Sequence, residues 1–172
     1  MTLTQQSATT TATNGPNADC ITIKTAFPQV LFNVDCWNVG ANSTYSVDKS
    51  QVHRRRGKKR DSSAYLWFSQ GHLVHVILSR LGLSTSIPVQ LGDLGRALII
   101  DLSGNNIVGT IPPQIAQITD LVVLKLNGNA ISGSIPPQLG NLHNLKTLDL
   151  SNNHITGNIP IELAQLTNLH VL

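Results

Sequence analysis

The sequence predicts an α/β solenoid, in which short parallel strands line a concave side and successive turns of the chain share one core. Residues 73–168 divide into four units of 24 residues without insertion, and a truncated fifth unit begins at residue 169. The units start at Leu73, Ala97, Leu121 and Leu145. Positions 1, 4, 6, 11, 15, 19 and 22 are apolar in all four. Because one unit cannot bury its own apolar face, stacked units must share a continuous core.

Each unit is expected to begin with a strand and a tight bend. Positions 4 and 6 point inward and positions 3, 5 and 7 point outward, which is the two-residue period of a strand. Position 9 is Asn105, Asn129 or Asn153 in three of the units. A short amide both donates and accepts, so it can pair backbone groups that are buried where the chain turns. We expect these three asparagines to form a structural ladder.

The middle of the second, third and fourth units carries the sequence signature of a known family. Leu-Ser-Gly-Asn-Asn-Ile-Val-Gly-Thr-Ile-Pro (102–112) and Leu-Ser-Asn-Asn-His-Ile-Thr-Gly-Asn-Ile-Pro (150–160) resemble plant-type leucine-rich repeats, which the Gly-x-Ile-Pro element marks. Such repeats occur in receptor-like proteins, receptor kinase ectodomains and polygalacturonase-inhibiting proteins. The resemblance covers residues 73–172. It implies a right-handed superhelix with a 3-10 or irregular convex side, a helical N-terminal cap, and ligand recognition on the concave face.

Four segments are expected along the chain. Residues 1–18 are rich in Thr, Ala, Asn and Gln and predict a disordered polar tail. Residues 19–39 are expected to form the cap, residues 40–63 an exposed basic insertion, and residues 64–172 the repeat domain.

The cap and the insertion leave alternatives open. Cys36-Trp37-Asn38-Val39-Gly40 partly matches the family's capping motif, which implies a Cys20–Cys36 disulfide; the alternative is two reduced thiols. The basic run 53–60 is interpreted as a solvated loop, with nuclear targeting, an RNA contact or a processing site after Arg60 as alternatives. Asn42-Ser43-Thr44 is a candidate glycosylation acceptor.

Composition and charge exclude several classes of protein. No run approaches the ~18 apolar residues of a membrane-spanning helix, so membrane contact is expected only through a segment outside this sequence. Residues 71–172 carry four basic and five acidic groups, which offer no surface for specific nucleic-acid binding. The first 19 residues lack the basic start and apolar core of a signal peptide. The resemblance nevertheless implies an extracellular or cell-surface location, with a cytoplasmic one as the alternative.

The outward strand positions predict the ligand surface. The candidate contacts are His75, Ile77, Arg80, Asp101, Lys125, Asn127, Asp149 and Asn152. Position 5 reads Ile, Asp, Lys, Asp across adjacent strands, so cross-strand charge pairing explains this row as well as a ligand does. The units contain no aromatic anchor, which predicts either that these four units alone bind weakly or that further repeats supplied the anchors. No catalytic constellation, metal-ligand set or cofactor loop stands out, so we expect no enzyme activity, metal or cofactor.

The sequence therefore predicts a noncatalytic recognition module of a receptor-like or secreted protein, in signalling or defence, that binds a protein or peptide, with carbohydrate as an alternative. Two other interpretations stay open, namely the sensing ectodomain of a receptor-like serine/threonine kinase and an intracellular scaffold. Only four residues follow the fourth unit, so its core face is expected to be partly exposed and to promote self-association. The residues of that face are Leu145, Leu148, Leu150, Ile155, Ile159, Leu163 and Leu166.

Overall fold

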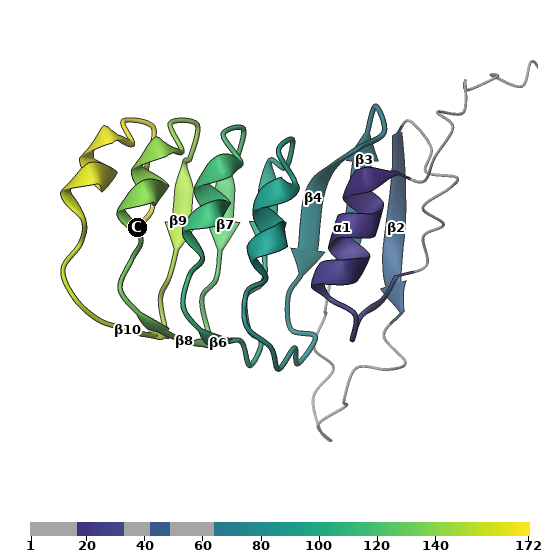
Figure 1. Cartoon of the computed structure of the whole chain (residues 1–172), viewed down its shortest axis with the longest axis horizontal. Coiled ribbons are helices and arrows are strands. Elements are labelled where there is room, and N and C mark those ends of the chain that lie inside the picture. Colours follow the sequence, from purple (N-terminus) through teal and green to yellow (C-terminus); the bar gives the residue numbers. More distant parts are fainter. Residues whose placement is uncertain (1–16, 33–41, 49–63) are drawn as a thin grey trace, which may run out of the picture.

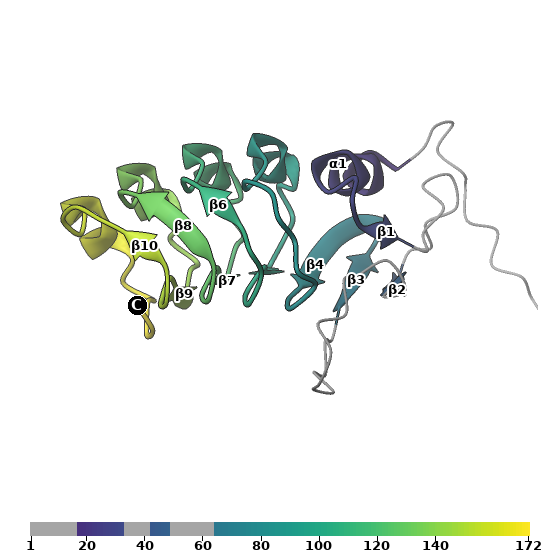
Figure 2. The ribbon, with the colours of Figure 1, turned by 90° about the horizontal axis from the view of Figure 1, so that it is seen from below.

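The chain forms the expected solenoid (Figure 1). The structure is a computed structural model, and it describes residues 17–32, 42–48 and 64–172. Strands of a main sheet lie on one side of the solenoid, and a row of short helices lies on the other (Figure 2). The cap helix α1 (Ala18–Ala26) stands at the N-terminal end of that row.

The main sheet has seven strands in the order β1-β2-β3-β4-β5-β7-β9. Strands β1 to β4 pair antiparallel, and β4, β5, β7 and β9 pair parallel. The 24-residue period sets the register, so that position 4 of each unit faces position 4 of the next, as Ile100 faces Leu124. The strand bounds are β1 Leu31–Phe32, β2 Asn42–Asp48, β3 Ala64–Ser69, β4 His72–Leu78, β5 Ile99–Asp101, β7 Val123–Lys125 and β9 Thr147–Asp149.

The opposite side consists of one 3-10 helix per unit, which confirms the expectation of a 3-10 convex side. Each helix follows a proline in extended conformation, such as Pro112 with ψ 132° before η3. Proline has no backbone N–H and restricts the residue before it, so it ends the preceding segment and sets the start of the turn. The helices are η2 (Val89–Asp93), η3 (Pro113–Gln117), η4 (Pro137–Asn141) and η5 (Ile161–Gln165). A second parallel sheet, in the order β10-β8-β6, was not predicted; its strands are β6 (Val108–Gly109), β8 (Ala130–Gly133) and β10 (His154–Ile155).

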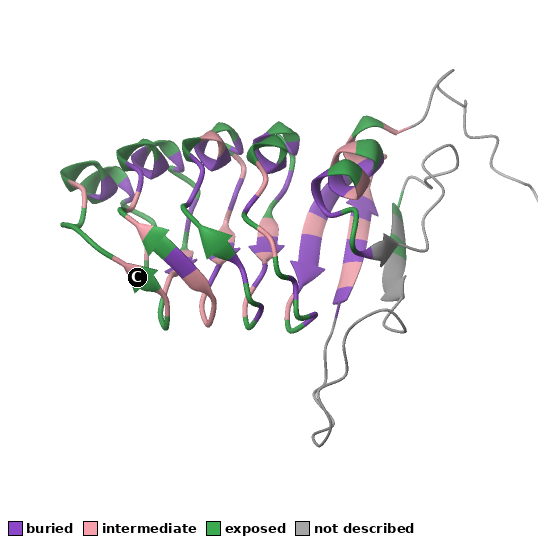
Figure 3. Ribbon diagram, turned by 60° about the horizontal axis from the view of Figure 1, so that its bottom comes forward, coloured by how far each residue is buried: buried purple, intermediate pink, exposed green. Residues whose placement is uncertain are grey.

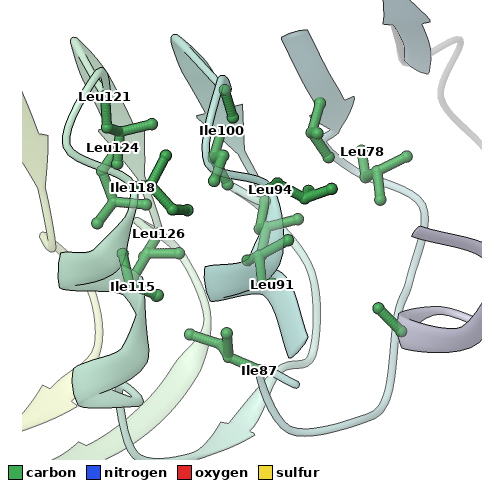
Figure 4. Close-up of a cluster of buried hydrophobic side chains, with 14 of the residues drawn as sticks. Leu78, Ile87, Leu91, Leu94, Ile100, Ile115, Ile118, Leu121, Leu124 and Leu126 are labelled. Carbon is green, nitrogen blue, oxygen red and sulfur yellow. The ribbon is translucent and has the colours of Figure 1, made fainter. Parts of the chain in front are cut away.

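The core fills the space between the main sheet and the 3-10 helices (Figure 4). Leu91 and Leu94 of the first unit and Ile115 and Ile118 of the second point from the helix side toward Ile100 and its neighbours on the strands, and all five are fully buried. Each 3-10 helix has buried residues on one face and exposed residues on the other (Figure 3). One apolar layer is thus shared from unit to unit, as the pattern predicts.

An asparagine ladder runs through this core and joins neighbouring units. The Asn129 amide donates to the carbonyls of Leu102 and Leu126, at 3.1 and 2.8 Å, and its Oδ1 accepts from the N–H of Ile107 at 3.0 Å. Asn153 repeats this pattern one unit later, with acceptor carbonyls on Leu126 and Leu150. Each asparagine therefore pairs backbone groups of its own unit and of the one before, which would otherwise be buried unpaired.

Asn105 makes the largest set of these bonds. The first unit has Leu81 where the others have asparagine, and Asn105 Oδ1 accepts from the N–H groups of both Leu81 and Leu83, at 2.9 and 3.1 Å. Its amide donates to the carbonyls of Leu78 and Leu102 at 2.9 and 2.8 Å. Asn105 is only 6% exposed, so it completes the bend of a unit that lacks its own asparagine.

The cap helix begins earlier than expected. Asn17 and Ala18, which the sequence assigns to the tail, cap and begin α1, because the Asn17 side chain accepts from the N–H of Cys20. Asp19 ties the helix to the repeats, since its Oδ2 accepts from the N–H of Leu73 at 2.9 Å. Cys20 is fully buried. Its expected partner Cys36 lies outside the described residues, so the Cys20–Cys36 disulfide stays a prediction.

Residues 42–48 correct the expected insertion. They form β2, which pairs antiparallel with β3 over Asn42–Ser46, so they belong to the sheet rather than to an exposed loop. The segment alternates Thr44, Ser46 and Asp48 with Tyr45 and Val47, a pattern that favours a strand once a neighbour is present. The basic run 53–60 lies outside the described residues. Asn42 itself is exposed, and its glycosylation stays a prediction.

The C-terminal face is more covered than expected. Leu145, Leu148, Leu163 and Leu166 are buried, so the expectation of exposure is wrong for these four, whereas Ile159 is 64% exposed. The last residues lie against β9, where the N–H of Leu148 donates to the carbonyl of Val171 at 2.9 Å, and Leu169 packs against the core. Leu150 and Ile155 are half-buried. Self-association through this end stays a prediction.

Candidate binding surface

The open face of the main sheet is the side of β4, β5, β7 and β9 that is turned away from the 3-10 helices. Position 5 of the units forms one row across it, because Ile77 pairs with Asp101, Asp101 with Lys125, and Lys125 with Asp149. Neighbouring strands are about 4.8 Å apart, so the two aspartates stand roughly 10 Å from each other with Lys125 between them. The structure thus brings together four of the residues predicted to contact a ligand.

The two aspartates are held by the same local contact. Asp101 Oδ1 accepts from the N–H and the hydroxyl of Ser103, at 2.9 and 2.6 Å. Asp149 Oδ1 accepts from the N–H and the hydroxyl of Ser151, at 3.1 and 2.7 Å. Each serine therefore fixes one carboxylate oxygen in the same orientation and leaves the other oxygen for a further partner. Sequence reasoning missed this role, although the Asp-x-Ser spacing of two residues on one strand face is the signal for it.

Lys125 takes part in no ion pair with its neighbours on the sheet. Among the described residues, the oppositely charged side chains within 4 Å of each other are Arg96 and Asp120, and Asp19 lies 3.5 Å from His72, a contact that is an ion pair only when the histidine is protonated. The cross-strand pairing that could explain the charged row is therefore not formed within that distance. Lys125 is half-buried between two carboxylates that serines already hold.

Ile77 does not serve the predicted role. Its side chain is only 9% exposed, so it is a buried residue rather than a ligand contact, and the prediction is wrong here. Ile77 pairs with Tyr65 of β3 on one side and with Asp101 of β5 on the other. If the repeats began the sheet, β4 would be an edge strand and Ile77 would be open on one side. Strand β3 occupies that side and places Tyr65 next to Ile77.

His75 lies beside the cap rather than at the centre of the surface. Its ring meets that of Trp67 edge to face, with centroids 4.4 Å apart and an interplanar angle of 63°. Burial lowers the pKa of His75 from its ordinary value of 6.5, because desolvation disfavours the charged imidazolium.

This lowered pKa predicts a pH-dependent stability. The unfolded chain binds a proton at His75 at a higher pH than the folded chain does, so the His75 contribution is complete above pH 6.5 and is lost as the pH falls below it. Urea unfolding at about pH 7.5 and about pH 5.5 should show a larger loss of stability for the natural chain than for His75→Gln. Equal losses in the two proteins would contradict this assignment.

Arg80 and Asn152 occupy the bend after the strand, at position 8. Both have left-handed backbones, with φ of 57° and 54°, where the second and third units have Gly104 and Gly128. The Arg80 side chain lies along Gly104: a Cβ placed on that glycine would come 2.9 Å from Arg80 Cγ. A non-glycine residue in this conformation costs about 1–2 kcal/mol, so Arg80 and Asn152 are held there by the surrounding bend. Both side chains are exposed at the edge of the open face.

Asn127 takes the place of the serines in the third unit. It is half-buried, and its Oδ1 is buried without a donor among the described residues. Toward the N-terminal ends of the strands, Ile99 and Val123, which the repeat register also places outward, form an apolar, half-buried part of the same face. The surface is therefore a charged row beside a small apolar strip.

Two further features bear on function. Within residues 17–32, 42–48 and 64–172, no three His, Cys, Asp or Glu side chains come together as a metal site would require. The helices of the same residues are all too short or too polar to cross a bilayer.

Comparisons with known proteins agree with this fold. Family models described as leucine-rich repeats match residues 98–118 and, as two copies, residues 119–157. A search of curated proteins finds no match.

Solved structures give closer neighbours. In the complex of the Arabidopsis receptor kinase HAESA with the peptide hormone IDA and the co-receptor SERK1, one chain is 39% identical over 58% of this chain and 17% of that chain, with a TM-score of 0.56. In the Arabidopsis thaliana BIR3–SERK2 complex, one chain is 36% identical over 60% of this chain and 55% of that chain, with a TM-score of 0.57. A structure of PEPR1–AtPEP1 covers 90% of this chain and 21% of that one at 24% identity and a TM-score of 0.64, and this likeness concerns the fold alone. The present chain thus spans less than two thirds of each of these chains.

Proposed function

Because this chain is a plant-type leucine-rich repeat protein, we propose that it is a noncatalytic recognition module that binds a peptide or protein on the open face of its main sheet. The observation that carries the proposal is the row Asp101–Lys125–Asp149. Its carboxylates are oriented by serines, and its lysine has no ion-pair partner among the described residues. A charged row that is not satisfied within the protein is available to a charged partner, and such complementarity gives specificity and a faster association rate.

The context of this module is also part of the proposal. Neighbouring structures are of ectodomains and receptor kinases in complex with peptide hormones and co-receptors, which supports a receptor-like or secreted protein outside the cell, in signalling or defence. The same neighbours support a second candidate, the sensing ectodomain of a receptor-like serine/threonine kinase. The intracellular scaffold has no such support.

The test uses a displayed library of random 12-residue peptides, selected on the natural chain and then measured one by one. We expect Lys125→Glu to weaken the selected peptides at least tenfold, because it turns a mixed row into three adjacent negative charges. The control is Lys146→Glu, the same charge reversal at an exposed lysine outside the row, which should leave the affinity unchanged.

Lys146→Glu should unfold within about 0.5 kcal/mol of the natural chain, since its side chain lies outside the core. Lys125→Glu is expected to lose about 1–2 kcal/mol through repulsion from Asp101 and Asp149, which leaves it folded for the binding measurement. Equal affinities of the two variants for every selected peptide would place recognition elsewhere and overturn the proposal.

A further inference from the structure

The spacing of the 3-10 helices depends on one position of the repeat. Position 20 is Gly92 in η2 and Gly140 in η4, and a Cβ added there would come 2.4 Å from the carbonyl oxygen of Gln114 and 2.5 Å from that of Glu162. Carbon and oxygen atoms do not approach so closely, so a side chain at either position would force the helices apart. Helix η3 therefore packs directly on η2, and η5 on η4, because glycine is present.

Position 20 is not glycine in η3, the helix that packs against η4. It is Ala116, which is 8% exposed and already carries a Cβ. Helix η4 cannot approach η3 as closely as the glycines allow in the neighbouring pairs. A shallow depression of about 280 Å³ lies there, which we call the amide groove. Its lining residues are Pro113, Gln114, Ala116, Gln117, Gln138 and Asn141.

The lining of the amide groove is neutral and rich in hydrogen-bonding groups. Four of its six residues are Gln or Asn, and none is charged or aromatic. The neighbouring helices place Asp93 and Glu162 at the repeat positions that hold Gln117 and Gln138 here, so the neutral lining is confined to this pair of helices. Gln114 Oε1 is buried and accepts no hydrogen bond from the described residues.

We propose that the amide groove binds a neutral oligosaccharide, at a site separate from the open face of the sheet. Each side-chain amide offers a donor and an acceptor side by side, and each sugar hydroxyl also donates and accepts, so the two match in kind. A charged ligand would find no counter-charge, and the side chains of a peptide would find only Pro113 and Ala116 as apolar contacts. The groove is smaller than the roughly 300–1,000 Å³ of enclosed ligand sites, so it holds about one sugar ring of a chain that crosses it.

The affinity is expected to be low. A few hydrogen bonds made in competition with water, without an aromatic ring for stacking, give a Kd on the order of 1–10 mM. The experiment therefore follows the side-chain amide signals of the labelled, complete chain by nuclear magnetic resonance. Its probes are cellotetraose, the anionic trimer of galacturonic acid, and tetra-alanine as the peptide.

The expected result is a saturable shift of the Gln114, Gln117, Gln138 and Asn141 amide signals with cellotetraose alone. Gln117→Leu should weaken this binding at least fivefold, whereas Gln165→Leu, at the same repeat position in η5 outside the groove, should leave it unchanged. The proposal is overturned if cellotetraose shifts none of these signals at 20 mM (roughly twice the weakest Kd expected), if the anionic trimer or the peptide binds as well, or if both variants bind equally. Thermal unfolding of both variants would confirm that they are folded.

Discussion

Replacing Asn105 with alanine is expected to lower the free energy of unfolding by about 3–5 kcal/mol. The change removes the partner of the N–H groups of Leu81 and Leu83 and of the Leu78 carbonyl, and it leaves these three groups inside the core. The Leu102 carbonyl also loses a bond but keeps the one from the Asn129 amide. Each buried group left unpaired costs about 1–3 kcal/mol, less when several relax together. Urea unfolding of the variant measures the loss directly.

Substitutions of two other asparagines serve as comparisons for the loss of stability expected in Asn105→Ala. Asn129→Ala should cost less, about 1–3 kcal/mol, because Asn129 Oδ1 accepts from the N–H of Ile107 alone. Asn106→Ala, at the neighbouring exposed position, should change stability by less than about 0.5 kcal/mol. If Asn105→Ala cost no more than Asn106→Ala, the ladder would not carry the stability that its bonds imply.

The second large effect is expected at Gly140. Replacing Gly140 with alanine should destabilise the fold by about 1–3 kcal/mol, because the new methyl group meets the Glu162 carbonyl oxygen at 2.5 Å. The obstacle is backbone, which cannot rotate away as a side chain would, so η5 must move off η4. The loss should appear as a lower midpoint of thermal unfolding.

Gly95→Ala is the matched control for this substitution. A Cβ at Gly95 would have no atom within 4 Å, and its φ is not positive, so the change should be neutral or stabilise by up to about 1 kcal/mol. Similar losses at Gly95 and Gly140 would show that close helix packing is not the cause.

The sequence predicted the parts of the fold that repeat, for a physical reason. A fixed 24-residue period forces each position to stack on its equivalent, so the row that includes Asp101 and Lys125 follows from counting. The repeat period does not predict contacts with segments that lie outside the repeats. Strand β2 was missed, and Ile77 was placed wrongly, because both depend on how the cap strands add to the first repeat.

The details of the candidate surfaces depend on finer geometry. The pattern of charges alone does not tell that Lys125 forms no ion pair within 4 Å, although it stands between two aspartates, or that serines hold one oxygen of each carboxylate. The alternation of Gly92, Ala116 and Gly140 is visible in the sequence, but its meaning appears only when the distance between adjacent turns of the chain is known.

The β3–β4 hairpin also bears on how the chain reaches this structure. Two residues, Gln70 and Gly71, join its strands with φ of 52° and 80°, the left-handed conformation that suits a tight hairpin turn. Such a hairpin closes in about 1–10 μs, whereas every later parallel strand must first close a 24-residue loop, which costs more entropy. We infer that folding starts at the hairpin and adds one unit at a time, so that amide protons of β4 should become protected from exchange before those of β9. Ribosomal synthesis delivers the units in this same order, so each new unit emerges beside a surface that is already folded and ready to receive it.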